Sequence, residues 1–237
     1  MVPLHDNNPT QTTPVVTYGL VGLNVFIFLY EIMLPDSALQ RFIETWGVIP
    51  ALLSASFDGQ VTILVWLTLI TSQFLHGGIF HVAGNMLYLW VFGNNVEDKL
   101  GHVRFLLFYL ACGVFASLFQ WYFSQGSNIS LIGASGAIAG VMGAYILRFP
   151  KAKILTFLPL FPLFLFLPTI RVPAYLFLGF WFVLQAFNSV VSLGMQTGED
   201  VGGVAYWAHS GGFVVGALLG PMLGLMNESP RGGDRRF

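Results

Sequence analysis

Six long apolar segments, separated by more polar stretches, constrain the fold of this chain more than any other feature. A membrane-spanning helix needs about 20 mostly apolar residues, with roughly 17 to 25 tolerated. Only 9% of the residues are charged, whereas a soluble domain carries about 25%, so the chain cannot cover a water-facing surface. We therefore expect an all-α polytopic membrane protein with a bundle of six transmembrane helices. The six predicted spans are Val15–Leu34, Gly77–Val96, Val103–Phe123, Gly133–Phe149, Pro173–Leu193 and Ala205–Met226.

The basic residues predict the orientation of these spans, because cytoplasmic loops are enriched in Lys and Arg. With six spans, the side that holds both termini carries nine of the ten basic residues, and the other side carries only Arg41. The nine are Lys99, Arg104, Arg148, Lys151, Lys153, Arg171, Arg231, Arg235 and Arg236. We therefore expect both termini to be cytoplasmic.

A seventh apolar stretch, Ile154–Pro168, is short for a span and contains three prolines. If it also crossed the membrane, the basic residues would divide five and five, so we expect it at the membrane interface. The interval Pro35–His76 carries charged residues and amphipathic pieces, which predicts an ordered loop outside or partly within the membrane. The expected division is a short cytoplasmic N-terminal tail over residues 1–14, a membrane domain over residues 15–226 and a cytoplasmic C-terminal tail over residues 227–237.

Four polar side chains stand near the outer ends of three predicted spans, where a polar group is costly and therefore a candidate for function. Ser135 is the third residue of the fourth span, and His209 is the fifth residue of the sixth span. His81 and Asn85 lie in the second span, one helical turn apart on one face. At 1.5 Å of rise per residue, all four lie roughly 3 to 12 Å from the starts of their helices. The topology thus predicts that they share one depth.

Glycine spacing indicates how these residues can meet. The sixth span has glycines at four-residue intervals, and the fourth span has a similar series. Small residues at such spacing let helix backbones approach closely in lipid. We therefore expect the fourth and sixth spans to pair tightly and to bring His209 towards Ser135. The glycines concerned are Gly136, Gly140, Gly143, Gly212, Gly216, Gly220 and Gly224.

This set of side chains suits acyl transfer. A serine hydroxyl is a weak nucleophile that needs a base within hydrogen-bond reach, and a neutral imidazole can take its proton and return it to a leaving amine. His81, Asn85 and the unpaired N–H groups at the start of the fourth span are candidates for binding the oxyanion. No acidic residue stands at this depth in the three spans, so we expect a Ser135–His209 dyad rather than a triad. Taken singly, each residue is more often a packing or hydrogen-bonding group, and the prediction depends on their joint placement.

The sequence contains neither a zinc-protease motif nor an α/β-hydrolase motif. It contains no H-E-x-x-H zinc motif, and the residues around Ser135 do not follow the G-x-S-x-G pattern of an α/β-hydrolase. The formal net charge of −1 gives no sign of nucleic-acid binding. We expect no metal, no cofactor and no nucleic-acid partner.

These motifs resemble those of the rhomboid intramembrane serine proteases over about Val15–Leu225. The resemblance matches the GxSG serine of that family to Ser135 and the AHxxG histidine to His209. It matches the HxxxN pair, regarded in the family as oxyanion stabilisers, to His81 and Asn85. The stretches that carry the resemblance are Leu69–Gly101, GASGAIAGVMGAY from Gly133, and Ala205–Gly220.

Two features depart from the family pattern, and one further residue agrees with it. The Trp-Arg pair often found in the first loop is replaced by Leu67 and Thr68. The position four residues after the serine, which in some members carries an aromatic that packs on the histidine, is Ala139. His76 matches a further family histidine, which we expect to be structural. Neither departure removes a catalytic group, but Ala139 leaves open how His209 is held.

The resemblance implies an endopeptidase that cuts membrane-anchored, single-span proteins in or near a transmembrane segment that unwinds easily, at a small residue. Its implied partners are these membrane-embedded substrates and the lipid bilayer, and its implied location is the bacterial cytoplasmic (inner) membrane. One alternative is a catalytically silent rhomboid-like protein that binds and escorts membrane clients, although such relatives typically lack the serine or the histidine. A small transporter is disfavoured, because no internal repeat is evident.

Overall fold

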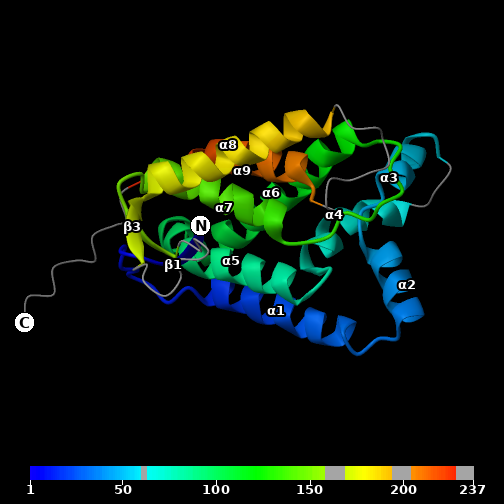
Figure 1. Ribbon diagram of the computed structural model, residues 1–237, viewed down its shortest axis with the longest axis horizontal. Coiled ribbons are helices and arrows are strands. Elements are labelled where there is room, and N and C mark those ends of the chain that lie inside the picture. Colours follow the sequence, from blue (N-terminus) through cyan, green and yellow to red (C-terminus); the bar gives the residue numbers. More distant parts are fainter. Residues whose placement is uncertain (60–62, 158–168, 194–203, 228–237) are drawn as a thin grey trace, which may run out of the picture.

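The computed structural model describes residues 1–59, 63–157, 169–193 and 204–227, and this part of the chain is mostly helical, as the sequence predicts. Each of the six apolar segments contains one long helix (Figure 1). Their ends lie within a few residues of the predicted ones. The six helices are α1 (Val15–Glu31), α5 (Ile79–Leu100), α6 (His102–Phe123), α7 (Ser135–Arg148), α8 (Ala174–Ser192) and α9 (Tyr206–Met222).

Length and hydropathy test which of these helices can cross a bilayer. Among the described residues, α6 and α8 are long and apolar enough by themselves. A third span results if the segment Ile63–Phe74 and α5, which meet at a bend of 82°, count as one. The helix α1 is apolar but has 17 residues, and α7 has 14. On this criterion the described residues contain two to three candidate spans of a helical membrane protein.

The centre of the bundle is α7. It contacts α5, α6, α8 and α9, and its ten consecutive residues Gly136–Tyr145 are all buried. Its position follows from its composition, because glycine and alanine make it thin enough for neighbours to approach from several sides. Large aromatic side chains belong to the same buried core. Those with no exposed surface are Phe92, Phe105, Phe108, Tyr109 and Tyr145.

The interval Pro35–His76 folds into short helices at one end of the molecule (Figure 1), which confirms the expectation of an ordered loop. They are α2 (Asp36–Trp46), α3 (Pro50–Phe57), the 3-10 helix η1 (Ile63–Leu67), α4 (Thr68–Thr71) and the 3-10 helix η2 (Ser72–Phe74). The Thr71 hydroxyl donates to the carbonyl of Trp46 at 2.7 Å. The Trp121 indole, on α6, donates to the Ser54 hydroxyl at 3.0 Å. These bonds tie the loop to itself and to the bundle.

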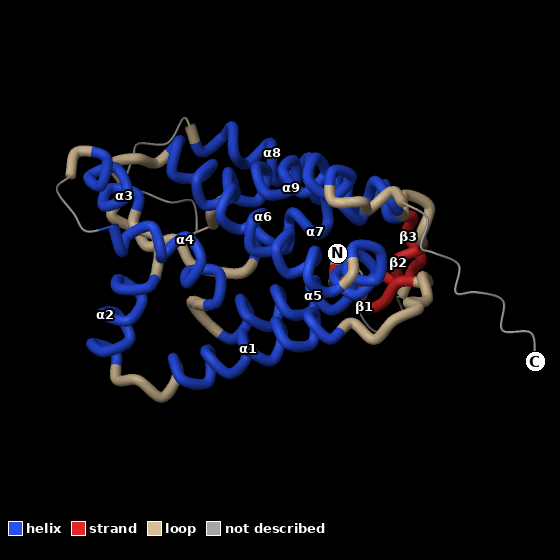
Figure 2. Tube along the Cα trace, turned by 180° about the vertical axis from the view of Figure 1, so that it is seen from behind, coloured by secondary structure: helices blue, strands red, loops and turns tan. Residues whose placement is uncertain are grey.

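A small antiparallel sheet lies at the opposite end and corrects the all-α expectation (Figure 2). Its strands are β1 (Val2–Asp6), β2 (Lys153–Phe157) and β3 (Ile170–Pro173), in the order β1-β2-β3. Residues 1–14, expected as a tail, therefore contain a strand of the fold. The strands have four or five residues each, and their partners are far apart in the sequence, so local periodicity does not reveal them. The first part of the expected interfacial stretch Ile154–Pro168 belongs to β2, and residues 158–168 lie outside the described residues.

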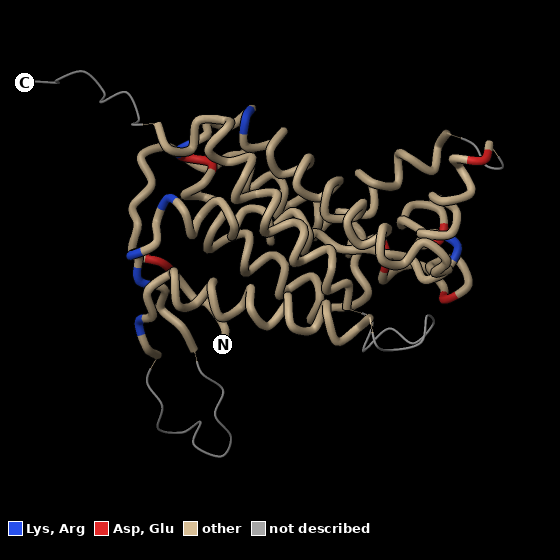
Figure 3. Tube along the Cα trace, turned by 90° about the horizontal axis from the view of Figure 1, so that it is seen from above, with Lys and Arg blue, Asp and Glu red and all other residues tan. Residues whose placement is uncertain are grey.

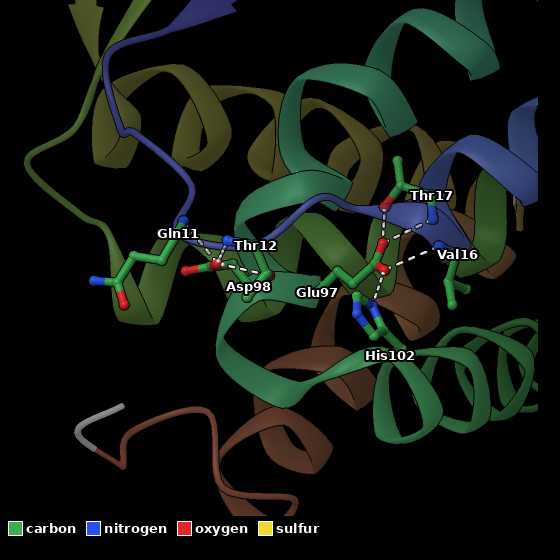
Figure 4. A network of polar contacts seen from close by, with 7 residues as sticks. All are labelled: Gln11, Thr12, Val16, Thr17, Glu97, Asp98 and His102. Atoms are coloured by element: carbon green, nitrogen blue, oxygen red, sulfur yellow. Dashed lines mark hydrogen bonds and ion pairs between the residues drawn. The ribbon is translucent and has the colours of Figure 1, made fainter. Parts of the chain in front are cut away.

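Two acidic residues at the end of α5 fasten the N-terminal segment to the bundle (Figure 4). Glu97 accepts two backbone N–H groups of the first turn of α1, including that of Thr17 at 2.7 Å, and also the Thr17 hydroxyl. His102 donates from Nδ1 to the same carboxylate at 2.6 Å. Asp98 accepts the backbone N–H and the hydroxyl of Thr12. The first N–H groups of a helix lack partners within it, so Glu97 supplies the cap that α1 does not contain.

Candidate active site

Glycines on α7 and α9 form a seam in which the two backbones touch. A Cβ atom added at Gly216 would overlap the carbonyl of Gly140, and one added at Gly212 would overlap the carbonyl of Gly136. On the other side of the seam, a Cβ at Gly143 would overlap the carbonyl of Phe213. Any side chain at these positions would push the helices apart. The close pairing predicted from the glycine spacing is therefore confirmed.

This seam brings Ser135 and His209 together. Ser135 is the first residue of α7, and His209 lies in the first turn of α9. His209 Nε2 is 2.8 Å from Ser135 Oγ, although the two residues are 74 positions apart in the sequence. Both side chains are half-buried. A serine within hydrogen-bond distance of an imidazole is the arrangement that activates the hydroxyl as a nucleophile.

The other face of His209 contacts α8. Its Nδ1 lies 3.0 Å from Gln185 Oε1, and its ring lies 5.9 Å from the ring of Trp181, centroid to centroid. Ala139, at the position four residues after Ser135, is fully buried and offers no aromatic ring to pack on His209. Trp181 is thus an aromatic neighbour of the imidazole that comes from a different helix. Neither Trp181 nor Gln185 was predicted from the sequence. The signal available there was their four-residue spacing in the fifth predicted span.

His81 lies beside the loop that leads into α7. The backbone N–H of Gly77 donates to His81 Nδ1 at 3.4 Å. Because Nδ1 accepts, the proton of the neutral ring is on Nε2. That Nε2 atom lies 2.8 Å from the position that a Cβ of Gly133 would occupy, and Gly133 has φ +122°. Only glycine fits at position 133, so the Nε2–H donor of His81 lies against the backbone two residues before Ser135.

Asn85 faces the same loop from the next turn of α5. Its Nδ2 lies 3.0 Å from His76 Nε2 and 3.6 Å from the Cβ position of Gly133. An amide nitrogen carries two donors, so one N–H donates to His76 and the second remains on the side of Gly133. His76 is itself fixed, since its backbone N–H donates to the buried Glu31 carboxylate at 3.2 Å. The contact of His76 with Asn85 orients the Asn85 amide, which is a structural role of the kind expected for His76.

A small cavity adjoins the serine. Its volume is about 30 Å³, and it is lined by residues of η2, α6, α7 and α9 and of the segment before α7. A water molecule needs roughly 10 to 15 Å³ of such space, so one or two waters fit. The lining includes Gly113, Ala116, Gly136 and Ala137. The described part of the site therefore combines a serine hydroxyl, an imidazole within hydrogen-bond distance of it, two N–H donors and room for water.

Comparison with known proteins identifies relatives of the chain. The model of the rhomboid domain family matches residues 64–225. Rhomboid protein 1, mitochondrial, of Saccharomyces cerevisiae is 30% identical over 209 residues, which cover 86% of this chain and 52% of that protein. Rhomboid protease GluP of Bacillus subtilis is 35% identical over 131 residues, covering 55% and 24%. The human Presenilin-associated rhomboid-like protein, mitochondrial, is 33% identical over 159 residues, covering 65% and 38%. The chain thus spans about half or less of the length of each of these relatives.

Proposed function

The chain belongs to the rhomboid family, and from this premise we propose that it is an intramembrane serine endopeptidase. It cleaves membrane-anchored, single-span proteins in or near their transmembrane segments. The observation that carries the proposal is the distance of 2.8 Å between His209 Nε2 and Ser135 Oγ. A relative named as a protease, from Bacillus subtilis, supports the same reaction class.

In the proposed mechanism, Ser135 Oγ attacks the carbonyl carbon of the scissile peptide while His209 Nε2 takes the hydroxyl proton. The tetrahedral intermediate carries an oxyanion. His209 then gives the proton to the leaving amine, which breaks the C–N bond and leaves an acyl group on Ser135. A water molecule, deprotonated by His209, then attacks this ester. The bond between the acyl carbon and Ser135 Oγ breaks, His209 returns the proton to Oγ, and the acid is released. The cavity beside Ser135 has room for that water.

The proposed oxyanion stabilisers are the two donors of α5 and the backbone at the start of α7. His81 offers its Nε2–H and Asn85 its second Nδ2–H, both on the side of Gly133. The N–H of Ser135 belongs to the first turn of α7, where N–H groups have no partner within the helix. Donors held in advance around a developing negative charge stabilise it more than mobile water does.

We also propose six spans with both termini on the cytoplasmic side. Most of the described Lys and Arg residues gather at the end of the molecule that holds the sheet (Figure 3), including Lys153 in β2 and Arg171 in β3. Arg41 lies in α2, at the opposite end. Ser135 begins α7 at the end away from the sheet. Since α7 has 14 residues, it is about 21 Å long, and a hydrocarbon core is about 30 Å thick. In this topology Ser135 lies below the non-cytoplasmic surface.

The proposed location is a bacterial cytoplasmic membrane, which the relative from Bacillus subtilis supports. Other relatives have names that place them in mitochondria, so a mitochondrial membrane is the alternative. Fractionation of the source cells, with detection of the chain in one membrane, decides between them.

A cleavage assay tests the proposed function. Purified protein is reconstituted into liposomes with a single-span substrate, and mass spectrometry locates the cut. The wild type should release a fragment cut in or near the transmembrane segment, whereas Ser135→Ala and His209→Ala should not. Cleavage that persists in Ser135→Ala would contradict the proposal. Binding of the substrate without cleavage by the wild type would instead support a client-binding protein.

A further inference from the structure

Three side chains on α8 follow one another at four-residue intervals and face α9. The Trp181 ring lies against the ring of His209 at an interplanar angle of 38°. Gln185 Oε1 lies 3.0 Å from His209 Nδ1. The hydroxyl oxygens of Ser189 and Ser210 lie 3.0 Å apart, and both serines are buried. Residues four apart share one face of a helix, so α8 presents a single stripe to the helix that carries the base.

The rest of α8 indicates that the Gln185 amide is placed for this contact. The residues around it on the helix are mostly apolar, and Val183, Leu184 and Phe187 among them are exposed. A polar side chain in such surroundings is costly unless it finds a hydrogen-bond partner. Its partner is the imidazole of His209.

The two hydrogen bonds of His209 together select one tautomer. An amide oxygen only accepts, so the bond to Gln185 requires the proton on Nδ1. Nε2 is then unprotonated and can accept from the Ser135 hydroxyl at 2.8 Å. The opposite tautomer would carry a proton on Nε2 and could not act as the base. Once His209 has taken the proton of Ser135, both ring nitrogens are donors, and the amide oxygen still accepts from Nδ1–H.

We propose that Gln185 is a positioning residue for the catalytic base: it holds His209 in the tautomer that can deprotonate Ser135 and accepts from the imidazolium during the reaction. The inference rests on the proposed protease function. In a Ser-His-Asp triad a carboxylate has this place. Here an uncharged amide supplies the acceptor, which avoids the cost of an additional charge within the membrane. The acceptor also comes from a helix that carries neither Ser135 nor His209, so separation of α8 from α9 removes it.

Three variants test this role by steady-state kinetics. Gln185→Met keeps the length of the side chain and removes the acceptor. A lost orienting hydrogen bond should lower kcat by about tenfold to a hundredfold and leave KM within about twofold. Gln185→Glu offers an oxygen acceptor in either protonation state and should retain most of the wild-type kcat. The control Ser189→Ala breaks the neighbouring contact to Ser210 on the same face and should stay near the wild type.

A spectroscopic measurement keeps the test independent of proteolysis. ¹⁵N NMR of histidine-labelled protein in detergent micelles reports which ring nitrogen of His209 carries the proton, with His209→Ala used to assign the signal. The wild type should show a proton on Nδ1, and Gln185→Met should show the Nε2–H tautomer or a mixture. If the wild type cleaves nothing, the proposed function fails, while the NMR result still decides the role of Gln185. An unchanged tautomer in Gln185→Met, or a loss of kcat in Ser189→Ala as large as in Gln185→Met, would overturn the inference.

Discussion

The two helices that flank α9 hold it in different ways. Along α7, glycine backbones of both helices touch, and any added Cβ would meet a carbonyl group. Along α8, the contact consists of side chains: one ring contact and two polar pairs. The first contact fixes the distance between Ser135 and His209, because neither backbone can shift without the other. In the second, the side chains of Gln185 and Trp181 contact the imidazole and define its orientation.

This difference separates two requirements of the proposed chemistry. The nucleophile and base must be held at hydrogen-bond distance, which a rigid glycine seam achieves. The base must also expose the correct nitrogen, which depends on a single hydrogen bond that is worth about 1.5 to 3 kcal/mol once the ring is charged. A change in the seam should therefore be more damaging than a change in the α8 stripe.

The largest effect is expected from Gly216→Ala in the seam. The new methyl group would overlap the carbonyl of Gly140, so α9 must move away from α7. A displacement of about 1 Å at the reacting atoms costs about 100-fold in rate, and overpacking of this kind destabilises by about 1 to 3 kcal/mol. Cleavage rate and thermal unfolding in detergent measure the two effects.

Gly179→Ala is the matched control for that variant. Gly179 lies on α8, and a Cβ added there would meet no atom within 4 Å. The substitution is chemically the same and should leave rate and stability near the wild type. Equal behaviour of the two variants would show that the seam does not set the geometry of the site.

A smaller effect is expected when the ring of Trp181 is removed from the α8 stripe. An aromatic contact of this kind contributes about 0.5 to 1.5 kcal/mol, so Trp181→Ala should lower kcat by about threefold to tenfold. Trp181→Phe keeps a ring beside His209 and should recover most of the activity. A loss that is the same for both variants would mean that the ring contact itself does not orient the base.

The smallest effect is expected at the C-terminal end of α7, where a substitution should change stability and leave the cleavage rate unchanged. Asp6, in β1, accepts from the hydroxyl of Tyr145, on α7, and from Asn95 at 3.0 Å. Burial raises the pKa of the Asp6 carboxyl above its ordinary value of 3.8, although the Tyr145 bond acts in the opposite direction. A raised pKa means that the folded protein binds this proton more tightly than the unfolded chain does. The stability from that proton is present at low pH and is lost as the pH rises through the folded-state value.

Asp6→Asn removes the titrating carboxyl, so this variant is the reference with which the wild type is compared. The difference in unfolding temperature between the wild type and Asp6→Asn should shift in favour of the wild type as the pH falls towards 3.8. Cleavage rates of the two proteins at one pH should be the same. A rate that falls in Asp6→Asn would show that the sheet end of α7 influences Ser135.

The two contacts also differ in how far the sequence predicts them. The seam was predicted from the glycine series of the fourth and sixth spans, because regularly spaced small residues in an apolar helix indicate close packing against another helix. The Gln185 contact was not predicted, since a glutamine in a span has many partners available and only packing selects one. The sheet was missed for a related reason. β1 and β2 are about 150 residues apart, and strands this short carry no periodicity of their own.

The central claim is that Ser135 is a nucleophile activated by His209, and an active-site label tests it most directly. A fluorophosphonate probe is incubated with the protein in detergent, and peptide mass spectrometry locates the adduct. We expect one adduct per chain on Ser135, none in Ser135→Ala and strongly reduced labelling in His209→Ala. Equal labelling of the wild type and Ser135→Ala would contradict the claim.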